Sequence, residues 1–203
     1  MRFTRSERGC LYTVSGPSGS GKTSLCVSLL EATPMLHLSV SCTTRTKRPG
    51  EIEAKDYHFL SEADFQAQVK EGAFLEYALV HGNMYGTRSS DIESMLARGY
   101  DVLLEIDWQG ACQVAEKMSN VCRIFVLPPS LSELRHRLQQ RGQDNADVIE
   151  RRVLAAREES RHEDEAEFRI INLDFGQSLN DLKSIVRAHR LREQLVKEVE
   201  TSP

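Results

Sequence analysis

The sequence contains no long apolar segment and no excess of charge of one sign. No stretch of its 203 residues approaches the roughly 18 consecutive apolar residues that a membrane-spanning helix requires. The 26 Lys and Arg nearly balance the 30 Asp and Glu, which leaves a formal net charge of −4. We therefore expect neither a membrane nor a nucleic acid as partner. The start of the chain is basic and polar, without the apolar core of a secretory signal.

Paired cysteines and metal-binding spacings are missing as well. The five cysteines are spread singly, with no C-x-x-C, and the six histidines show no H-x-x-x-H spacing. These patterns exclude the common zinc motifs and favour small buried thiols in a reducing compartment. We expect a cytoplasmic protein, and the sequence leaves homo-oligomer formation open.

One motif carries most of the information. An eight-residue run fits G-x-x-x-x-G-K-[ST], between an apolar segment at 11–14 and a helix-forming run that starts at Ser24. Its glycines let backbone N–H groups point at phosphate oxygens, at the positive end of the next helix. Lys22 is expected to reach the outer phosphates, and the Thr23 hydroxyl to bind Mg²⁺. The predicted ATP-phosphate site comprises Gly16, Pro17, Ser18, Gly19, Ser20, Gly21, Lys22 and Thr23.

The order of apolar and amphipathic segments predicts an α/β fold with a parallel sheet of about five strands flanked by helices. Expected strands are 11–15, 36–40, 102–106, 124–127 and 168–171. Expected helices are 22–31, 109–117, 131–140, 148–162 and 179–197. Two segments interrupt this order: 43–99, with alternating apolar residues and one helix at 62–70, and 139–167, which is densely charged.

We interpret residues 1–203 as one domain with two insertions. The core is expected at 9–42, 100–138 and 168–198, an acceptor-binding lobe at 43–99, and a mobile helical lid at 139–167. Such a plan suits a phosphotransferase, which must exclude water from the transferred group. In the lobe, Arg45 and Arg48 have forked guanidinium groups that suit a phosphate monoester, although the pair taken alone fits a solvated basic loop better.

Further motifs give the chain a close resemblance to guanylate kinases of the bacterial type. They follow the family's order from about Gly9 to Leu191. The matching segments are the phosphate loop, Ser41 to Glu51, Asp56-Tyr57, Phe74 to Tyr77, Asn83 to Thr87, Glu105 to Gly110 and Arg137 to Gly142. The resemblance implies Mg²⁺-dependent transfer of the γ-phosphoryl group of ATP to GMP, which gives ADP and GDP.

The resemblance also implies how GMP is bound. Its phosphate would be held by Arg45, Arg48, Tyr57 and Tyr85, and its guanine surrounded by Ser41, Glu76, Thr87 and Asp107. A carboxylate can accept from guanine N1–H and the N2 amine together, whereas adenine offers only an acceptor at N1. Glu76 would therefore select guanine over adenine. Asp107 follows an apolar strand, so it could serve guanine, Mg²⁺ through water, or both.

For ATP, the resemblance implies lid arginines at Arg137, Arg141 and Arg152, and Asn172 near the adenine. The predicted catalytic residues are Lys22, Arg45, Arg137 and Arg152. The chain departs from the family at Leu173, where a second acidic residue is common, and residues 160–167 lack the usual tyrosines. These departures concern lid packing and the adenine edge, and they leave the phosphate and guanine residues intact.

Two alternatives remain open at this point. One is a nucleoside-monophosphate kinase of another base specificity. The other is a non-catalytic guanylate-kinase-like module that binds phosphorylated peptides through the lobe. The intact Gly21-Lys22-Thr23 favours an enzyme, because a peptide binder has no use for a Mg²⁺-nucleotide cradle.

Overall fold

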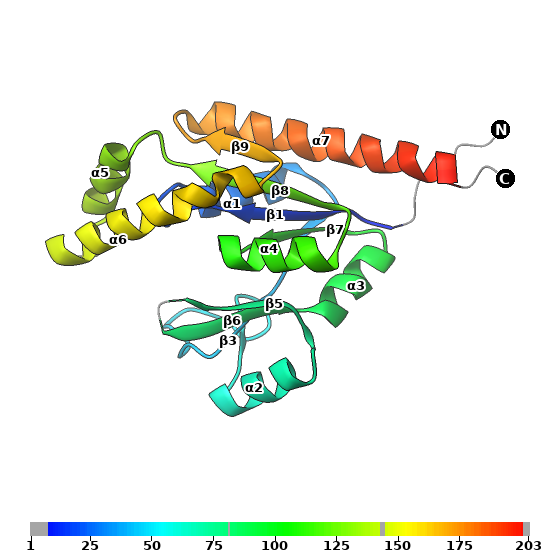
Figure 1. Ribbon diagram of the computed structural model, residues 1–203, viewed down its shortest axis with the longest axis horizontal. Helices are drawn as coiled ribbons and strands as arrows, with labels where there is room; N and C mark the ends of the chain where they lie inside the picture. The colour runs from blue at the N-terminus through cyan, green and yellow to red at the C-terminus, as the bar shows by residue number, and fades with distance from the viewer. Residues whose placement is uncertain (1–7, 81, 143–144, 201–203) are drawn as a thin grey trace.

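The structure confirms a parallel five-stranded sheet. It is a computed structural model that describes residues 8–80, 82–142 and 145–200. The strands lie in the order β2-β7-β1-β8-β9, and all four neighbouring pairs are parallel (Figure 1). Their bounds are β1 Leu11–Ser15, β2 Leu36–Leu38, β7 Asp101–Glu105, β8 Val121–Leu127 and β9 Phe168–Ile171.

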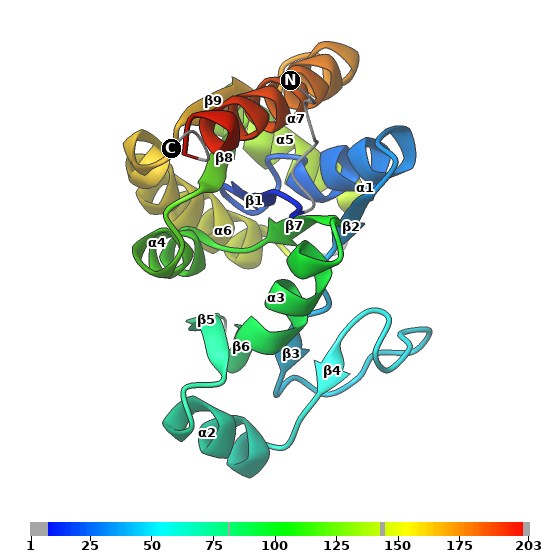
Figure 2. The same cartoon turned by 90° about the vertical axis from the view of Figure 1, so that its right-hand side faces the viewer.

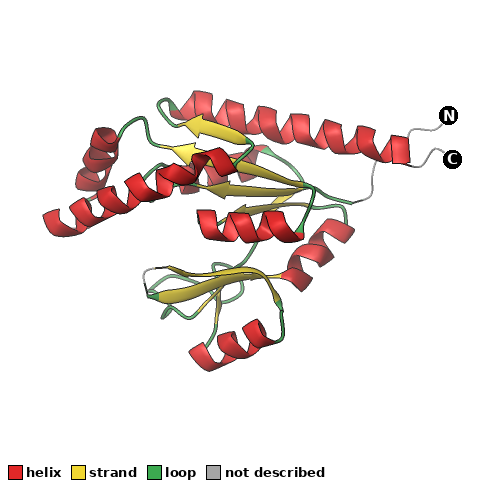
Figure 3. Cartoon of the chain, viewed as in Figure 1, coloured by secondary structure: helices red, strands yellow, loops and turns green. Residues whose placement is uncertain are grey.

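Helices cover both faces of this sheet (Figure 3). On one face Tyr12 is completely buried in a cluster that includes Leu25 of α1 (Lys22–Ala32) and Leu182 of α7 (Phe175–Glu200). On the other face the neighbouring Leu11 packs in a cluster with Leu96 of α3 (Ser89–Ala97) and Val114 of α4 (Trp108–Lys117). Successive strand residues point to opposite faces, so buried parallel strands are apolar throughout.

A second, four-stranded sheet occupies the predicted lobe at 43–99 and begins one residue before it, at Cys42. Its order is β4-β3-β6-β5, with β3 Cys42–Thr43, β4 His58–Phe59, β5 Phe74–Val80 and β6 Asn83–Arg88. Helix α2 (Glu62–Lys70) covers it through Phe65, which stacks on Phe74 with ring centroids 4.5 Å apart. Helix α4 lies between the two sheets (Figures 1 and 2).

The predicted lid segment holds the end of one helix and the whole of another. Helix α5 (Leu131–Arg141) packs on α6 (Ala146–Glu159) through Leu134, Leu138 and Val153, and the Asn145 side chain caps α6. The expected single helix at 148–162 is wrong at its end, because α6 stops at Glu159 and a 3₁₀ helix, η1 (Ser160–Glu165), follows. Within the described residues, no helix is both long enough and apolar enough to cross a membrane.

Candidate active site

The phosphate loop has a backbone that only glycine tolerates at its two ends. Gly16 has φ +135° and Gly21 has φ +94°, both in the region that side chains rarely adopt. A Cβ on Gly16 would lie 2.1 Å from the Val126 carbonyl oxygen, and one on Gly21 would lie 2.3 Å from Nδ2 of Asn172. Gly21 leads directly into α1, so the loop ends at a helix N-terminus, where phosphate oxygens are favoured.

Three side chains from later segments contact this loop. The buried Asn172 donates from Nδ2 to the Ser20 carbonyl oxygen at 2.8 Å. Arg137 of α5 donates to the Asn172 carbonyl oxygen at 3.0 Å and to the Ser20 carbonyl oxygen of the loop at 3.5 Å. Arg152 of α6 donates to Ser18 Oγ at 2.5 Å. The two predicted catalytic arginines therefore lie at the loop, and Asn172 supports its backbone. Contact of Asn172 with adenine stays a prediction, and the side chain of Arg141 lies outside the described residues.

The Thr23 hydroxyl donates a hydrogen bond to the Glu105 carboxylate at the end of β7. Asp107, two residues on, is engaged elsewhere: its Oδ1 accepts from the Gly110 N–H at 2.9 Å and caps α4. From the sequence, Asp107 is the carboxylate expected to serve Mg²⁺ through water, and Glu105 is not among the expected site residues. The signal was present, because Glu105 is the first carboxylate after the apolar run 102–104. Hydroxyl and carboxylate oxygens at a phosphate cradle are donors that Mg²⁺ takes.

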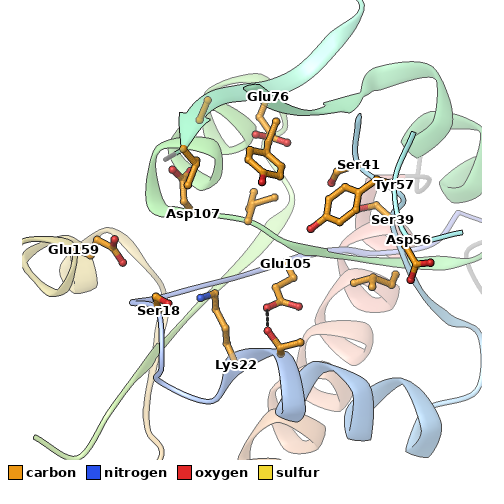
Figure 4. A pocket seen from close by; sticks show the side chains of 17 residues that line it. Ser18, Lys22, Ser39, Ser41, Asp56, Tyr57, Glu76, Glu105, Asp107 and Glu159 are labelled. Carbon is orange, nitrogen blue, oxygen red and sulfur yellow. Dashed lines mark hydrogen bonds between the residues drawn. The ribbon is translucent and has the colours of Figure 1, made fainter. Parts of the chain in front are cut away.

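A cavity of about 340 Å³ separates the phosphate loop from the lobe (Figure 4). In the figure, Lys22 and Ser18 lie on one side of the cavity, and Glu76 and Asp107 on the other. The predicted residues that line it are Gly16, Ser18, Lys22, Thr23, Ser41, Tyr57, Glu76, Tyr85 and Asp107. It is also lined by four polar residues that the sequence analysis did not select, Ser39, Asp56, Glu105 and Glu159. Both halves of the predicted site thus open on one space.

Glu76 is the most unusual carboxylate in the cavity. Its side chain comes from β5, and the residue is only 3% exposed. Its pKa is raised to about 7, chiefly by burial. The hydrogen bond from Thr87 at 2.6 Å opposes this shift, and the negative charge of Asp107 adds to it. Ser41 lies beside the same group, with its Oγ 3.5 Å from Thr87 Oγ1. The structure therefore brings the four predicted guanine residues together.

The predicted phosphate-binding residues of the lobe include Arg45, which forms an ion pair with Glu51. Arg45 makes a two-pronged contact with Glu51, at 2.6 and 3.2 Å, and its guanidinium lies 5.4 Å from the Tyr57 ring centroid. The Tyr57 and Tyr85 rings are 6.0 Å apart. Arg48 donates its backbone N–H to Glu51 at 2.7 Å, and its side chain is exposed. Glu51 therefore occupies the fork of Arg45, and the guanidinium keeps the pKa of Glu51 below its usual value.

Over most of its length the chain is similar to known proteins. The model of a family described as "Guanylate kinase" matches residues 8–189. Guanylate kinases of Hahella chejuensis and Methylobacillus flagellatus are each 50% identical, over 91% and 92% of this chain and 89% and 93% of theirs. A crystal structure of guanylate kinase from Anaplasma phagocytophilum superposes with a TM-score of 0.75 at 34% identity, covering 92% of this chain and 89% of that one.

Proposed function

Because the chain belongs to the guanylate kinase family, and is thus an ATP:GMP phosphotransferase, we propose how its residues divide that reaction. The observation that carries the proposal is that Lys22 and Glu76 line the same cavity. The phosphate loop lies on one side of this cavity and the buried Glu76 carboxylate on the other. This arrangement suits two nucleotides bound from opposite sides with their phosphates adjacent. Phosphoryl transfer requires mainly such positioning and charge neutralisation.

We assign the donor half to the phosphate loop and its neighbours. The loop backbone and Lys22 would bind the ATP phosphates, and Arg137 and Arg152, which already contact the loop, would add positive charge as the γ-phosphoryl group leaves. Asn172 would hold the loop in shape through Ser20. Thr23 and Glu105 would hold Mg²⁺, which neutralises phosphate charge when it is bound.

We assign the acceptor half to the lobe and the start of α4. The GMP phosphate would be bound by Arg45, Arg48, Tyr57 and Tyr85. To bind it, the Arg45 guanidinium would leave the Glu51 carboxylate and donate to the phosphate oxygens instead. Glu76 in its ionised form would accept from guanine N1–H and the N2 amine, with Asp107, Ser41 and Thr87 beside the base. No general base is needed, because the acceptor oxygen of GMP is already anionic at neutral pH.

The proposal is tested by assaying ADP formation with ATP and GMP, AMP, UMP or CMP, in the wild type and in Lys22→Ala. We expect turnover with GMP to be far faster than with AMP, UMP or CMP. In the variant we expect a loss of about 10³-fold in kcat, with its affinity for GMP retained. Comparable rates with AMP or UMP would favour a kinase of other base specificity. A folded wild type that does not bind ATP would favour a non-catalytic phosphopeptide-binding module.

Two further properties belong to the same proposal. The five cysteines of the chain are all free thiols in the structure, which supports a cytoplasmic location. ATP, GMP and Mg²⁺ are the proposed small-molecule partners, without nucleic acid or membrane.

A further inference from the structure

The outer edge of β5 is paired with side chains of α4 instead of with another strand. β5 is the last strand of its sheet, so every second residue turns its N–H and C=O away from β6. Tyr77 is such a residue. Its N–H donates to Gln113 Oε1 at 3.1 Å, and its carbonyl accepts from Gln113 Nε2 at 2.8 Å. The side-chain amide thus supplies the two bonds that a neighbouring strand would supply.

A second contact lies on the other side of Glu76. Lys117 donates from Nζ to the carbonyl oxygens of Phe74 at 3.1 Å and Leu75 at 2.7 Å. The backbone of β5 is therefore held immediately before and immediately after Glu76. Gln113 and Lys117 together make four hydrogen bonds to this one strand. Holding two long side chains in place costs conformational entropy, which these bonds must offset.

The same side of α4 touches the Glu76 carboxylate itself. A Cβ on Gly110 would lie 2.6 Å from Glu76 Oε2, so the carboxylate rests on bare helix backbone. Gly110, Gln113 and Lys117 recur at helical spacing, and Asp107, the other acidic residue of the guanine site, caps the same helix. Helix α4 therefore carries one carboxylate directly and fixes the strand that carries the other.

We propose that Gln113 and Lys117 are positioning residues for base recognition, which set the place of Glu76 relative to Asp107 by holding β5 on α4. The inference rests on the proposed reading of guanine by Glu76. Loss of these hydrogen bonds would let Glu76 move away from the base. The residues proposed for the phosphate, Arg45, Arg48, Tyr57 and Tyr85, all lie outside β5. Base selectivity should then fall without a general loss of phosphate binding.

The test compares Gln113→Met with Gln68→Met. Methionine keeps the length of the side chain and removes its hydrogen bonds. Gln68 is a matched control, because it accepts from Arg88 Nε at 2.9 Å within the same lobe but does not contact β5 in the described hydrogen bonds. For each variant, kcat and KM are measured for GMP and AMP with saturating ATP, together with the thermal unfolding midpoint.

We expect Gln113→Met to raise KM for GMP about tenfold, the effect of losing roughly one to two ordinary hydrogen bonds. The kcat at saturating GMP and the kcat/KM for AMP should change less than about twofold. Lys117→Met should act in the same direction, and it replaces Gln113→Met if that variant does not fold. Gln68→Met should leave the ratio of kcat/KM for GMP to that for AMP unchanged.

The inference is overturned if GMP and AMP lose efficiency together, if neither changes, or if Gln68→Met shifts the ratio equally. Any of these results would assign Gln113 a purely structural role in the lobe. The wild type separates the inference from the proposed function. A wild type that does not prefer GMP to AMP overturns both, whereas a selective wild type with an equally selective Gln113→Met variant overturns the inference alone.

Discussion

The carboxylate of Glu76 rests on the backbone of Gly110, at a position where a Cβ would come within 2.6 Å of Oε2. The contact joins β5 of the lobe to α4 beneath the large sheet. Glu76 cannot easily yield, because it is buried and its other oxygen accepts from Thr87 at 2.6 Å. This contact makes Gly110 part of the proposed guanine site, although it offers no side chain.

Gly110→Ala should therefore separate folding from recognition. Gly110 lies inside α4 without a positive φ, so alanine would favour the helix by about 0.5–1 kcal/mol. The added methyl group would nevertheless displace the Glu76 carboxylate. We expect KM for GMP to rise by about tenfold or more, an effect of at least about 1.4 kcal/mol, with little change in KM for ATP. Thermal unfolding and steady-state kinetics check the two effects separately, and unchanged KM for GMP would contradict the contact.

The raised pKa of Glu76 predicts a pH dependence near neutrality. Its pKa lies at about 7, above the ordinary value of 4.5, and the ionised form is the one proposed to bind guanine. Below pH 7 the apparent KM for GMP should rise by about tenfold per pH unit, and above pH 7 it should level off. Measurement of KM between pH 5.5 and about 8.5 checks this. Glu76→Gln is the control, because it retains only the titration of the GMP phosphate. An identical profile in the variant would refute the assignment.

The same shift has the opposite effect on folding. Burial favours the neutral carboxyl, so the contribution of Glu76 to stability is largest below its unfolded pKa of 4.5 and is lost as the pH rises through about 7. GMP affinity and fold stability should therefore respond to pH with opposite signs at this residue.

Glu105 and Asp107 should differ in the substrate that they affect. Glu105 bonds to Thr23 at the phosphate loop, whereas Asp107 caps α4 beside Glu76. We expect Glu105→Gln to lower kcat by about 10²-fold and to raise the Mg²⁺ concentration needed for half-maximal rate, with KM for GMP retained. Asp107→Asn should mainly raise KM for GMP. Titrations with Mg²⁺ and GMP distinguish the variants, and exchanged phenotypes would reverse the two assignments.

Much of the fold was predictable from local pattern. The strands at 11–15 and 168–171 and the helix at 62–70 have the bounds that the sequence predicts, because apolar runs between turn residues and a Ser61 cap are local signals. Helix α3 was missed. Only Ile92 and Leu96 of its nine residues are buried, and it lies within a segment whose aromatic residues indicate strands.

The site was less predictable where it depends on tertiary contacts. Lys22 and Thr23 belong to a contiguous motif whose spacing is diagnostic. Glu105 and Asp107 both follow the apolar run 102–104, so the local pattern does not decide between them. The contact that distinguishes Glu105 is its hydrogen bond with Thr23, 82 residues away. Gln113 is one of several polar residues on α4. Its role becomes visible only in the structure, where it bonds the backbone of Tyr77 at the unpaired edge of β5.

Recognition of guanine by Glu76 is tested by the ratio of kcat/KM for GMP to that for AMP, measured in the wild type and in Glu76→Gln. The wild-type ratio should lie between about 30 and about 4 × 10³, because mismatched buried groups cost roughly 2–5 kcal/mol and each tenfold corresponds to about 1.4 kcal/mol. Glu76→Gln should reduce that ratio by about tenfold or more while kcat/KM for AMP stays within about threefold. An unchanged ratio in the variant would show that residues other than Glu76 distinguish guanine from adenine, which would contradict the role proposed for Glu76.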